Sequence, residues 1–243
     1  MYFKNVDINS DVGEGVNNEA ILMPLISSCN IACNAHAGSV EIIDKVIDLA
    51  VQHNVKIGAH PSFPDRENFG RKVIEISNEE LEQSLKDQIQ LLIDRSTNQN
   101  AKIHHVKPHG ALYNIAAIDK NYATIVLNAI EETITDAYLY APYNSVIETL
   151  ARERNIKVKF EAFVDRTYNN DLSLVSRSSP KALITDKEEA WQQLKEMVQH
   201  QKVKTLHNNI ITIEADTFCV HGDNAHAIDM LKYINLKLNE FNK

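Results

Sequence analysis

Glycine is scarce in this sequence, and the positions where it does occur are informative. The chain has 243 residues but only 7 glycines, whereas an average usage of about 7% would give roughly 17. Each glycine lies in, or a few residues from, a cluster of His, Asp, Glu, Lys or Arg; the positions are Gly13, Gly15, Gly38, Gly58, Gly70, Gly110 and Gly222. Because glycine allows backbone conformations that other residues avoid, we expect unusual backbone geometry beside these polar clusters.

Other features that the sequence lacks exclude whole classes of protein. Its formal net charge is −8 and it has no basic run, so nucleic acid is not an expected partner. Its apolar runs are too short to span a bilayer, and we expect no membrane partner. Residues 1–7 lack the apolar core and cleavage site of a signal peptide, so we expect a cytoplasmic protein.

Cysteine is also rare, and its spacing is irregular. The three cysteines are Cys29, Cys33 and Cys219. An odd number without paired spacing argues against a disulfide framework, and Cys29 and Cys33 have no matching pair that would complete a zinc–thiolate site. We therefore expect all three to be structural.

Short apolar strands alternate with amphipathic helices along the chain. Strands are expected at residues 6–9, within 27–34, and at 55–59, 103–106, 137–141, 158–162 and 217–220, with a further short strand at 210–213 beside the main sheet. Helices are expected at 19–26, 40–50, 77–93, 119–130, 144–151, 186–198 and 225–238. The residues expected to begin or cap five of these helices are Ser39, Ser77, Asp119, Asn144 and Asp186.

This alternation is typical of a parallel sheet with crossover helices. Six or seven strand–helix units in about 240 residues favour an α/β fold of the closed (β/α) barrel type with seven strands. An open doubly wound sheet is the runner-up fold. There is no linker rich in Pro, Gly or Ser and no repeat, so we expect residues 1–243 to form a single domain.

Polar clusters follow the predicted strands at their carboxyl ends. They are Asp11 with Glu14, His36, His60, Lys107 with His109, Asp165 with Arg166, and His221 with Asp223. Tyr113 and Asn114 follow Pro108, which stops its strand, and Gly110, which permits a turn. Because the carboxyl ends of parallel barrel strands share one face, we expect these groups to form one functional face.

The residue types leave several roles open. Asp11, His60 and His109 are candidate ligands for zinc or another transition ion, or they hydrogen-bond one another or a substrate. Lys107 suits a carboxylate-binding or phosphate-binding cation, or a base if it is buried. The remaining histidines are expected to be non-catalytic: His53, His104, His105, His200, His207 and His226.

The last two clusters are equally ambiguous. Asp165 beside Arg166 suits a general base with an anion clamp, or a structural ion pair. His221 suits an oriented imidazole, whereas Asp223 also fits the cap of the following helix.

The motifs around these residues resemble the LamB/YcsF family, which is also known as the family of A-type subunits of 5-oxoprolinase. The similar stretches are 7–15, 30–38, 58–61, 106–114, 165–168 and 220–223, in the same order. The chain departs from the family pattern at Asn34 and Ala35, where Gly-Phe is usual, at Ser39, where Asp is usual, and in a shorter loop at 15–19. The substitutions before and after His36 are expected to alter the pocket lining and hence substrate preference, and the shorter loop is expected to alter a rim.

The resemblance implies a barrel related to the glycoside hydrolase/deacetylase superfamily and ATP-dependent opening of the 5-oxo-L-proline lactam to L-glutamate. It also implies partner subunits of the B and C type. The sequence has no G-x-G-x-x-G or P-loop motif, which fits a division of labour in which those partners mainly handle ATP. A homo-oligomer is also compatible with the sequence.

We therefore predict a lactam-hydrolysing subunit that acts on a small-molecule substrate, with ATP as co-substrate. Whether it also binds a divalent metal is not decided by the sequence. The predicted catalytic residues are Asp11, His36, His60, Lys107, His109, Asp165 and His221. The predicted substrate-binding residues are Glu14, Tyr113, Asn114, Arg166 and Asp223. The alternatives are a metal-dependent deacetylase of N-acetyl sugars and a binding subunit without chemistry of its own.

Overall fold

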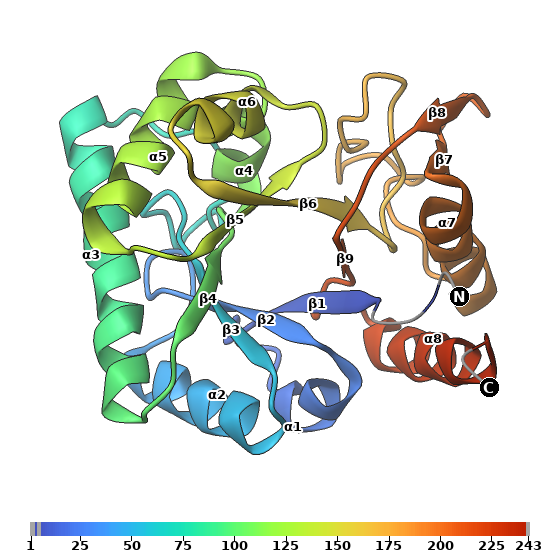
Figure 1. Cartoon of the computed structure of the whole chain (residues 1–243), viewed down its shortest axis with the longest axis horizontal. Coiled ribbons are helices and arrows are strands. Elements are labelled where there is room, and N and C mark those ends of the chain that lie inside the picture. Colours follow the sequence, from blue (N-terminus) through green and yellow to red (C-terminus); the bar gives the residue numbers. More distant parts are fainter. Residues whose placement is uncertain (1–2, 4–5, 242–243) are drawn as a thin grey trace.

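The expected strands form one closed parallel barrel. The computed structural model describes Phe3 and residues 6–241, and the barrel lies at its centre (Figure 1). Around the barrel the strands are β1 Asp7–Val12, β2 Ser28–Ala32, β3 Lys56–His60, β4 Ile103–Val106, β5 Tyr138–Pro142, β6 Lys157–Phe163 and β9 Thr217–Cys219. Neighbouring strands are parallel, and β1 pairs with β9. Closure confirms the predicted barrel and excludes the open sheet.

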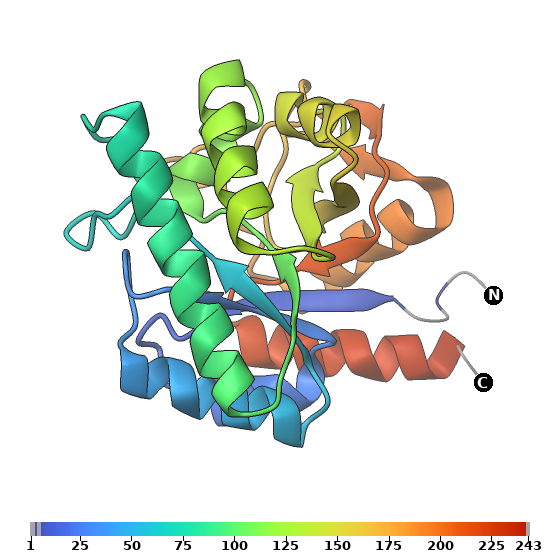
Figure 2. The same cartoon turned by 60° about the vertical axis from the view of Figure 1, so that its left-hand side comes forward.

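Helices surround the barrel (Figure 2). They are α1 Glu19–Leu22 with the 3-10 turn η1 Met23–Leu25, α2 Val40–Gln52, α3 Asn78–Asn98, α4 Gly110–Ala116, α5 Lys120–Thr133, α6 Val146–Glu153, α7 Lys187–His200 and α8 Ala227–Phe241. None of these helices combines the length and the apolar character needed to cross a bilayer.

Side-chain caps begin the predicted helices. As expected, Ser39, Ser77, Asp119 and Asp186 each accept backbone N–H bonds from the first turn. The prediction for α6 is wrong by one residue, because Ser145 caps this helix. Asn144 instead takes the left-handed turn before it, with a φ of 60°.

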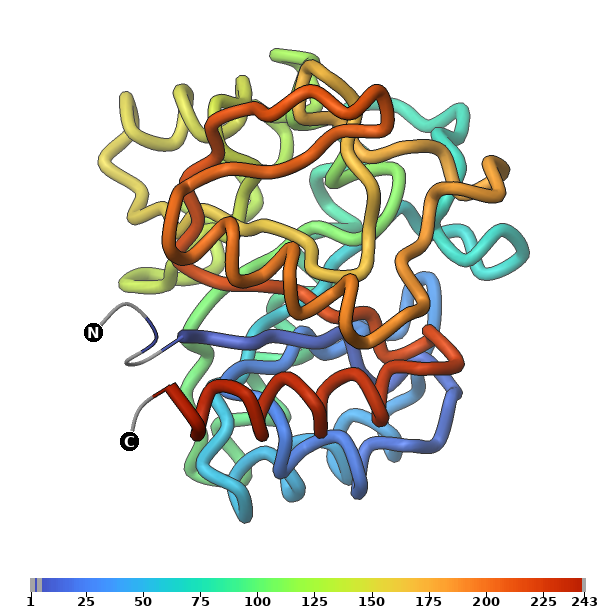
Figure 3. The backbone as a smooth tube through the Cα atoms, turned by 90° about the vertical axis from the view of Figure 1, so that its right-hand side faces the viewer, coloured from blue at the N-terminus to red at the C-terminus, as the bar shows by residue number. Residues whose placement is uncertain are grey.

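Two elements were not predicted from the sequence. The first is helix α4, which begins where we expected only a turn. Its first residue, Gly110, lies close to another loop, since a Cβ there would be 2.7 Å from the carbonyl oxygen of Gly70. β7 Lys202–Lys204 pairs antiparallel with β8 Ile210–Thr212, and this hairpin lies outside the barrel (Figure 3).

The barrel interior carries polar side chains. Asn30 Nδ2 lies 2.8 Å from both Asn9 Oδ1 and Asp11 Oδ1. Asn30 Oδ1 lies 2.7 Å from Nε2 of His105, whose buried ring stacks on Tyr140 with centroids 3.8 Å apart. This network supports the Asp11 carboxylate from inside the barrel.

Gly58 on β3 makes room for this network. A Cβ at Gly58 would lie 2.1 Å from His105 Nε2, so Gly58→Ala forces the ring or the strand to move. We expect the substitution to lower the free energy of unfolding by about 1–3 kcal/mol in urea denaturation. Adding His105→Ala removes the clash, so the double variant should lose less than the sum of the two single variants. Additive losses would contradict this explanation.

Candidate active site

The carboxyl ends of the barrel strands open into a cavity of about 590 Å³. Most of the predicted site residues line it: Asp11, Glu14, His60, Lys107, His109, Tyr113, Asn114, Arg166, His221 and Asp223. His36 and Asp165 lie behind this lining and hydrogen-bond to it. The structure therefore brings polar groups from separate segments to one face of the barrel, while their individual roles stay predictions.

Lys107, directly after β4, places its ammonium group in the floor of the cavity. Its Nζ lies 2.9 Å from Asp11 Oδ1, 2.9 Å from Glu161 Oε1 and 3.3 Å from Cys219 Sγ. Burial disfavours the charged amine, but the carboxylates outweigh burial and hold the pKa of Lys107 well above its ordinary value. The neighbouring carboxylates therefore favour the charged form of Lys107, which supports its role as a cation more than its role as a base. Cys219, like the other two cysteines, is buried and free.

Glu161 is a candidate that the sequence reasoning missed. It lies within β6, and the only available signal was an acidic residue near the carboxyl end of a strand. Apart from the ion pair with Lys107, its carboxylate and the Tyr113 hydroxyl have no hydrogen-bond partner of normal geometry among the described residues. Burial and the Glu161 carboxylate raise the pKa of Tyr113 well above its ordinary value. The cavity thus offers a bound molecule one acceptor and one neutral donor.

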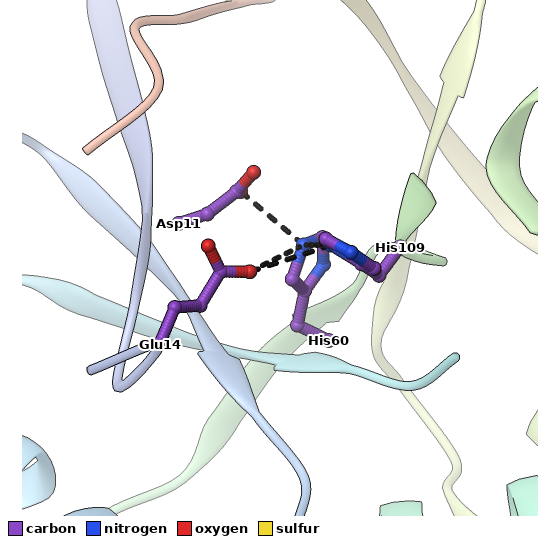
Figure 4. A group of neighbouring side chains, drawn as sticks. All are labelled: Asp11, Glu14, His60 and His109. Carbon is purple, nitrogen blue, oxygen red and sulfur yellow. Dashed lines mark hydrogen bonds and ion pairs between the residues drawn. The ribbon is translucent and has the colours of Figure 1, made fainter. Parts of the chain in front are cut away.

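Beside Lys107, two imidazoles and two carboxylates lie close together; they belong to His60, His109, Asp11 and Glu14 (Figure 4). His60 ends β3, and His109 lies at the residue just before α4. Their Nε2 and Nδ1 atoms lie 2.9 Å apart. Glu14 Oε1 lies 3.4 Å from His109 Nδ1, and Asp11 Oδ1 lies 3.5 Å from His60 Nε2. Burial and the neighbouring imidazoles hold the pKa of His109 well below its ordinary value. Glu14 thus joins Asp11, His60 and His109, which the sequence predicted as candidate metal ligands.

His36 supports this cluster from outside the cavity. Its ring stacks on His109 with centroids 3.8 Å apart and an interplanar angle of 2°. Its Nδ1 lies 2.8 Å from Ser62 Oγ, and its Nε2 lies 3.1 Å from Glu14 Oε1. Burial lowers the pKa of His36 to about 3 and raises the pKa of Glu14 well above its ordinary value. His36 therefore holds both the Glu14 carboxyl group and the His109 ring in position.

Asp165, just after β6, is buried behind His221. Its Oδ1 lies 2.8 Å from His221 Nδ1, and its Oδ2 accepts the backbone N–H of His221 at 3.0 Å. Burial favours a higher pKa for Asp165, but the charge and hydrogen bonds of His221 outweigh burial and lower it. Arg166 donates instead to the carbonyl oxygens of Val175 and Ala182. Asp165 and Arg166 thus have different partners and do not hydrogen-bond each other. Asp165 orients the His221 imidazole.

Asp223 lies at the rim of the cavity between two arginines. Its Oδ2 is 2.5 Å from Arg71 Nη2 and 3.3 Å from Arg177 Nη1. Helix α8 begins only at Ala227, so the alternative reading of Asp223 as its cap is wrong. Both rim arginines line the cavity together with Arg166. Because one carboxylate balances only one guanidinium, this mouth suits an anion.

The substitutions expected to alter the pocket lining lie elsewhere. Asn34 has a φ of 64°, and its two oxygen atoms accept hydrogen bonds from Arg66. Ser39 caps α2. Neither these residues nor Ala35 line the 590 Å³ cavity, so the expectation that they alter its lining is wrong.

Comparisons with known proteins identify the family of this chain and support its fold. The sequence model of the LamB/YcsF family matches residues 6–243. The A-type subunit of 5-oxoprolinase from Shouchella clausii is 42% identical over 228 residues, covering 92% of this chain and 90% of that protein. Its counterpart from Bacillus cytotoxicus, of the same name, is 39% identical over 235 residues, covering 95% and 93%. The crystal structure of a lactam utilization protein from Thermus thermophilus superimposes with a TM-score of 0.90 at 35% identity, covering 98% and 97%.

Proposed function

Because the chain belongs to the LamB/YcsF family, we propose that it is the lactam-opening subunit of an ATP-dependent 5-oxoprolinase, which hydrolyses 5-oxo-L-proline to L-glutamate. The names of its relatives and of its structural neighbour support this reaction class. The observation that carries the proposal is the buried Lys107 cation at the floor of a cavity with arginines at its mouth. A small cyclic amide with a carboxylate matches this distribution of charge.

The lactam must be activated before water can open it, because its amide is resonance-stabilised. Transfer of a phosphoryl group from ATP to the amide oxygen makes the ring carbon a better electrophile. This sequence has no common nucleotide-binding motif. We therefore assign the phosphorylation to partner subunits of the B and C type, and the addition of water to this chain.

We assign each residue of the cavity a role according to its charge and its hydrogen-bonding groups. Lys107 is placed to stabilise the negative charge that develops on oxygen at the reacting carbon. Apart from the ion pair of Glu161 with Lys107, the Glu161 carboxylate and the Tyr113 hydroxyl have no hydrogen-bond partner of normal geometry among the described residues, so both can hydrogen-bond the ring. His221, held by Asp165, is placed to transfer a proton to the departing ring nitrogen. The rim arginines attract the substrate carboxylate.

Reconstitution tests this proposal directly. This chain, its B-type and C-type partners, 5-oxo-L-proline, ATP and water should together release L-glutamate, ADP and inorganic phosphate, because the phosphoryl group leaves as phosphate when water opens the ring. Omitting this chain should abolish glutamate release. Turnover that is unchanged without it would favour a binding role without chemistry.

A metal-dependent deacetylase is the second candidate, and one observation favours it. The His60–His109 pair lies beside two carboxylates, as in sites that activate water on a metal. This alternative predicts that the chain alone releases acetate from an N-acetyl sugar without ATP. Lactam opening predicts no acetate and an absolute need for ATP.

A further inference from the structure

The hydrogen bonds of His60 and His109 leave two ring nitrogens facing each other. His60 Nδ1 lies 2.7 Å from the carbonyl oxygen of Lys107, and His109 Nε2 lies 2.9 Å from the carbonyl oxygen of Phe69. A carbonyl oxygen only accepts, so both of these nitrogens carry the proton. In the neutral rings His60 Nε2 and His109 Nδ1 are therefore both acceptors, 2.9 Å apart. Two lone pairs at this distance repel each other unless a cation lies beside both.

Two carboxylate oxygens complete this cluster of acceptors. Glu14 Oε1 lies 3.4 Å from His109 Nδ1 and 3.9 Å from His60 Nε2. Asp11 Oδ1 lies 3.5 Å from His60 Nε2, and all four atoms lie within 4.8 Å of one another. Ligands about 2.0–2.2 Å from a common ion lie roughly 3–3.5 Å apart. The cluster therefore has nearly the spacing of a single coordination sphere.

We propose that Glu14, His60 and His109 bind one divalent transition-metal ion, with Asp11 as a weaker fourth ligand. Two imidazoles and a carboxylate form a donor set suited to zinc and its neighbours and less suited to calcium or magnesium. Asp11 is the weaker ligand because its Oδ1 already accepts hydrogen bonds from Lys107 and from the interior network.

The surroundings fit a metal site in two further ways. The carbonyl oxygens that hold the two imidazoles fix the tautomer and direction of each ring, as outer-shell partners do in known metal sites. All four ligands also line the open cavity, which gives an ion a path from solvent. The assignment depends on side-chain geometry and holds whether or not the chain opens a lactam.

A proton shared between the two imidazoles is the competing explanation for their close approach. It satisfies the same lone pairs, but it predicts a protein that binds no metal at this position. Direct measurement of metal binding separates the two explanations without any assay of lactam turnover.

The test uses the full chain, purified without chelator and then dialysed. Titration with Zn²⁺ alone in a calorimeter should show one equivalent bound, and Co²⁺ should give visible absorption bands typical of nitrogen ligation. Glu14→Gln and His109→Gln should each weaken Zn²⁺ binding by at least about tenfold. His226→Gln removes an exposed histidine outside the cluster and should leave binding unchanged.

Glu14→Gln is the decisive variant, because it keeps the size of the side chain while removing its charge. Circular dichroism and thermal unfolding establish that each variant is folded before binding is compared. Absence of stoichiometric Zn²⁺ and Co²⁺ binding would overturn the proposal in favour of the shared proton. Binding that stays within twofold in Glu14→Gln and His109→Gln would overturn it in favour of a site elsewhere.

Discussion

Replacing Lys107 with methionine should reduce lactam opening by about 10²–10³-fold, the cost of removing one preorganised charge-stabilising group from an active site. Methionine nearly keeps the length of the side chain, but it leaves Asp11 and Glu161 without the cation that lies 2.9 Å from each. Breaking a buried ion pair costs about 3–5 kcal/mol, so the free energy of unfolding should also fall. Glutamate release by the reconstituted subunits and urea denaturation measure the two effects.

A second variant separates chemistry from stability at this position. Adding Glu161→Gln to Lys107→Met removes one of the two unpaired charges, so part of the stability should return while turnover stays low. Lys102→Met, at an exposed lysine just before β4, is the matched control and should change neither quantity. Turnover of Lys107→Met within twofold of wild type would contradict the role assigned to this cation.

Asp165→Asn should lower kcat by about 10²–10⁴-fold, which is the usual contribution of general acid–base catalysis. The amide keeps the shape of the side chain but presents an N–H to His221 Nδ1, so the imidazole holds its proton on the other nitrogen. Asp165 does not line the cavity, so KM should change less than kcat. Asp229→Asn on the exposed part of α8 is the control. An effect confined to KM would rule out this positioning role.

The same substitution should change how stability depends on pH. The pKa of Asp165 is lower in the folded chain than its ordinary value, because His221 outweighs burial. Its ionised form therefore stabilises the fold above the unfolded-state pKa of about 3.9, and this contribution is lost as pH falls through the folded-state pKa. Asp165→Asn should be less stable near neutral pH and should lose less stability on acidification. Parallel acid curves in urea denaturation would contradict this.

The closed barrel was predictable because its causes are local and repeated. Alternating apolar strands, helix caps such as Ser77 and Asp119, and polar residues after each strand are all visible in the sequence. Helix α4 was not predictable in this way, since it is a short helix of 7 residues without a side-chain cap. In the β7–β8 hairpin only β8 was predicted. β7 was missed because it has 3 residues and forms a strand only through its pairing with β8.

Candidate site residues were visible in the sequence at or just after the carboxyl ends of strands, and not further inside a strand. His60, Lys107 and His109 lie at strand ends, where polar residues stand out. Glu161 lies within β6, and whether it faces the barrel interior is decided only when the sheet closes. The distinct partners of Asp165 and Arg166 were likewise hidden, because Asp165 lies in a bend after β6 and the groups that the two side chains contact come from later segments of the chain.

A crystal structure of this chain soaked with 5-oxo-L-proline tests the central claim most directly. We predict the ring in the 590 Å³ cavity, with its amide within hydrogen-bond distance of Lys107 or Glu161 and its carboxylate toward the rim arginines. A ring bound away from these groups, in a chain that is active when reconstituted with its partners, would contradict the account.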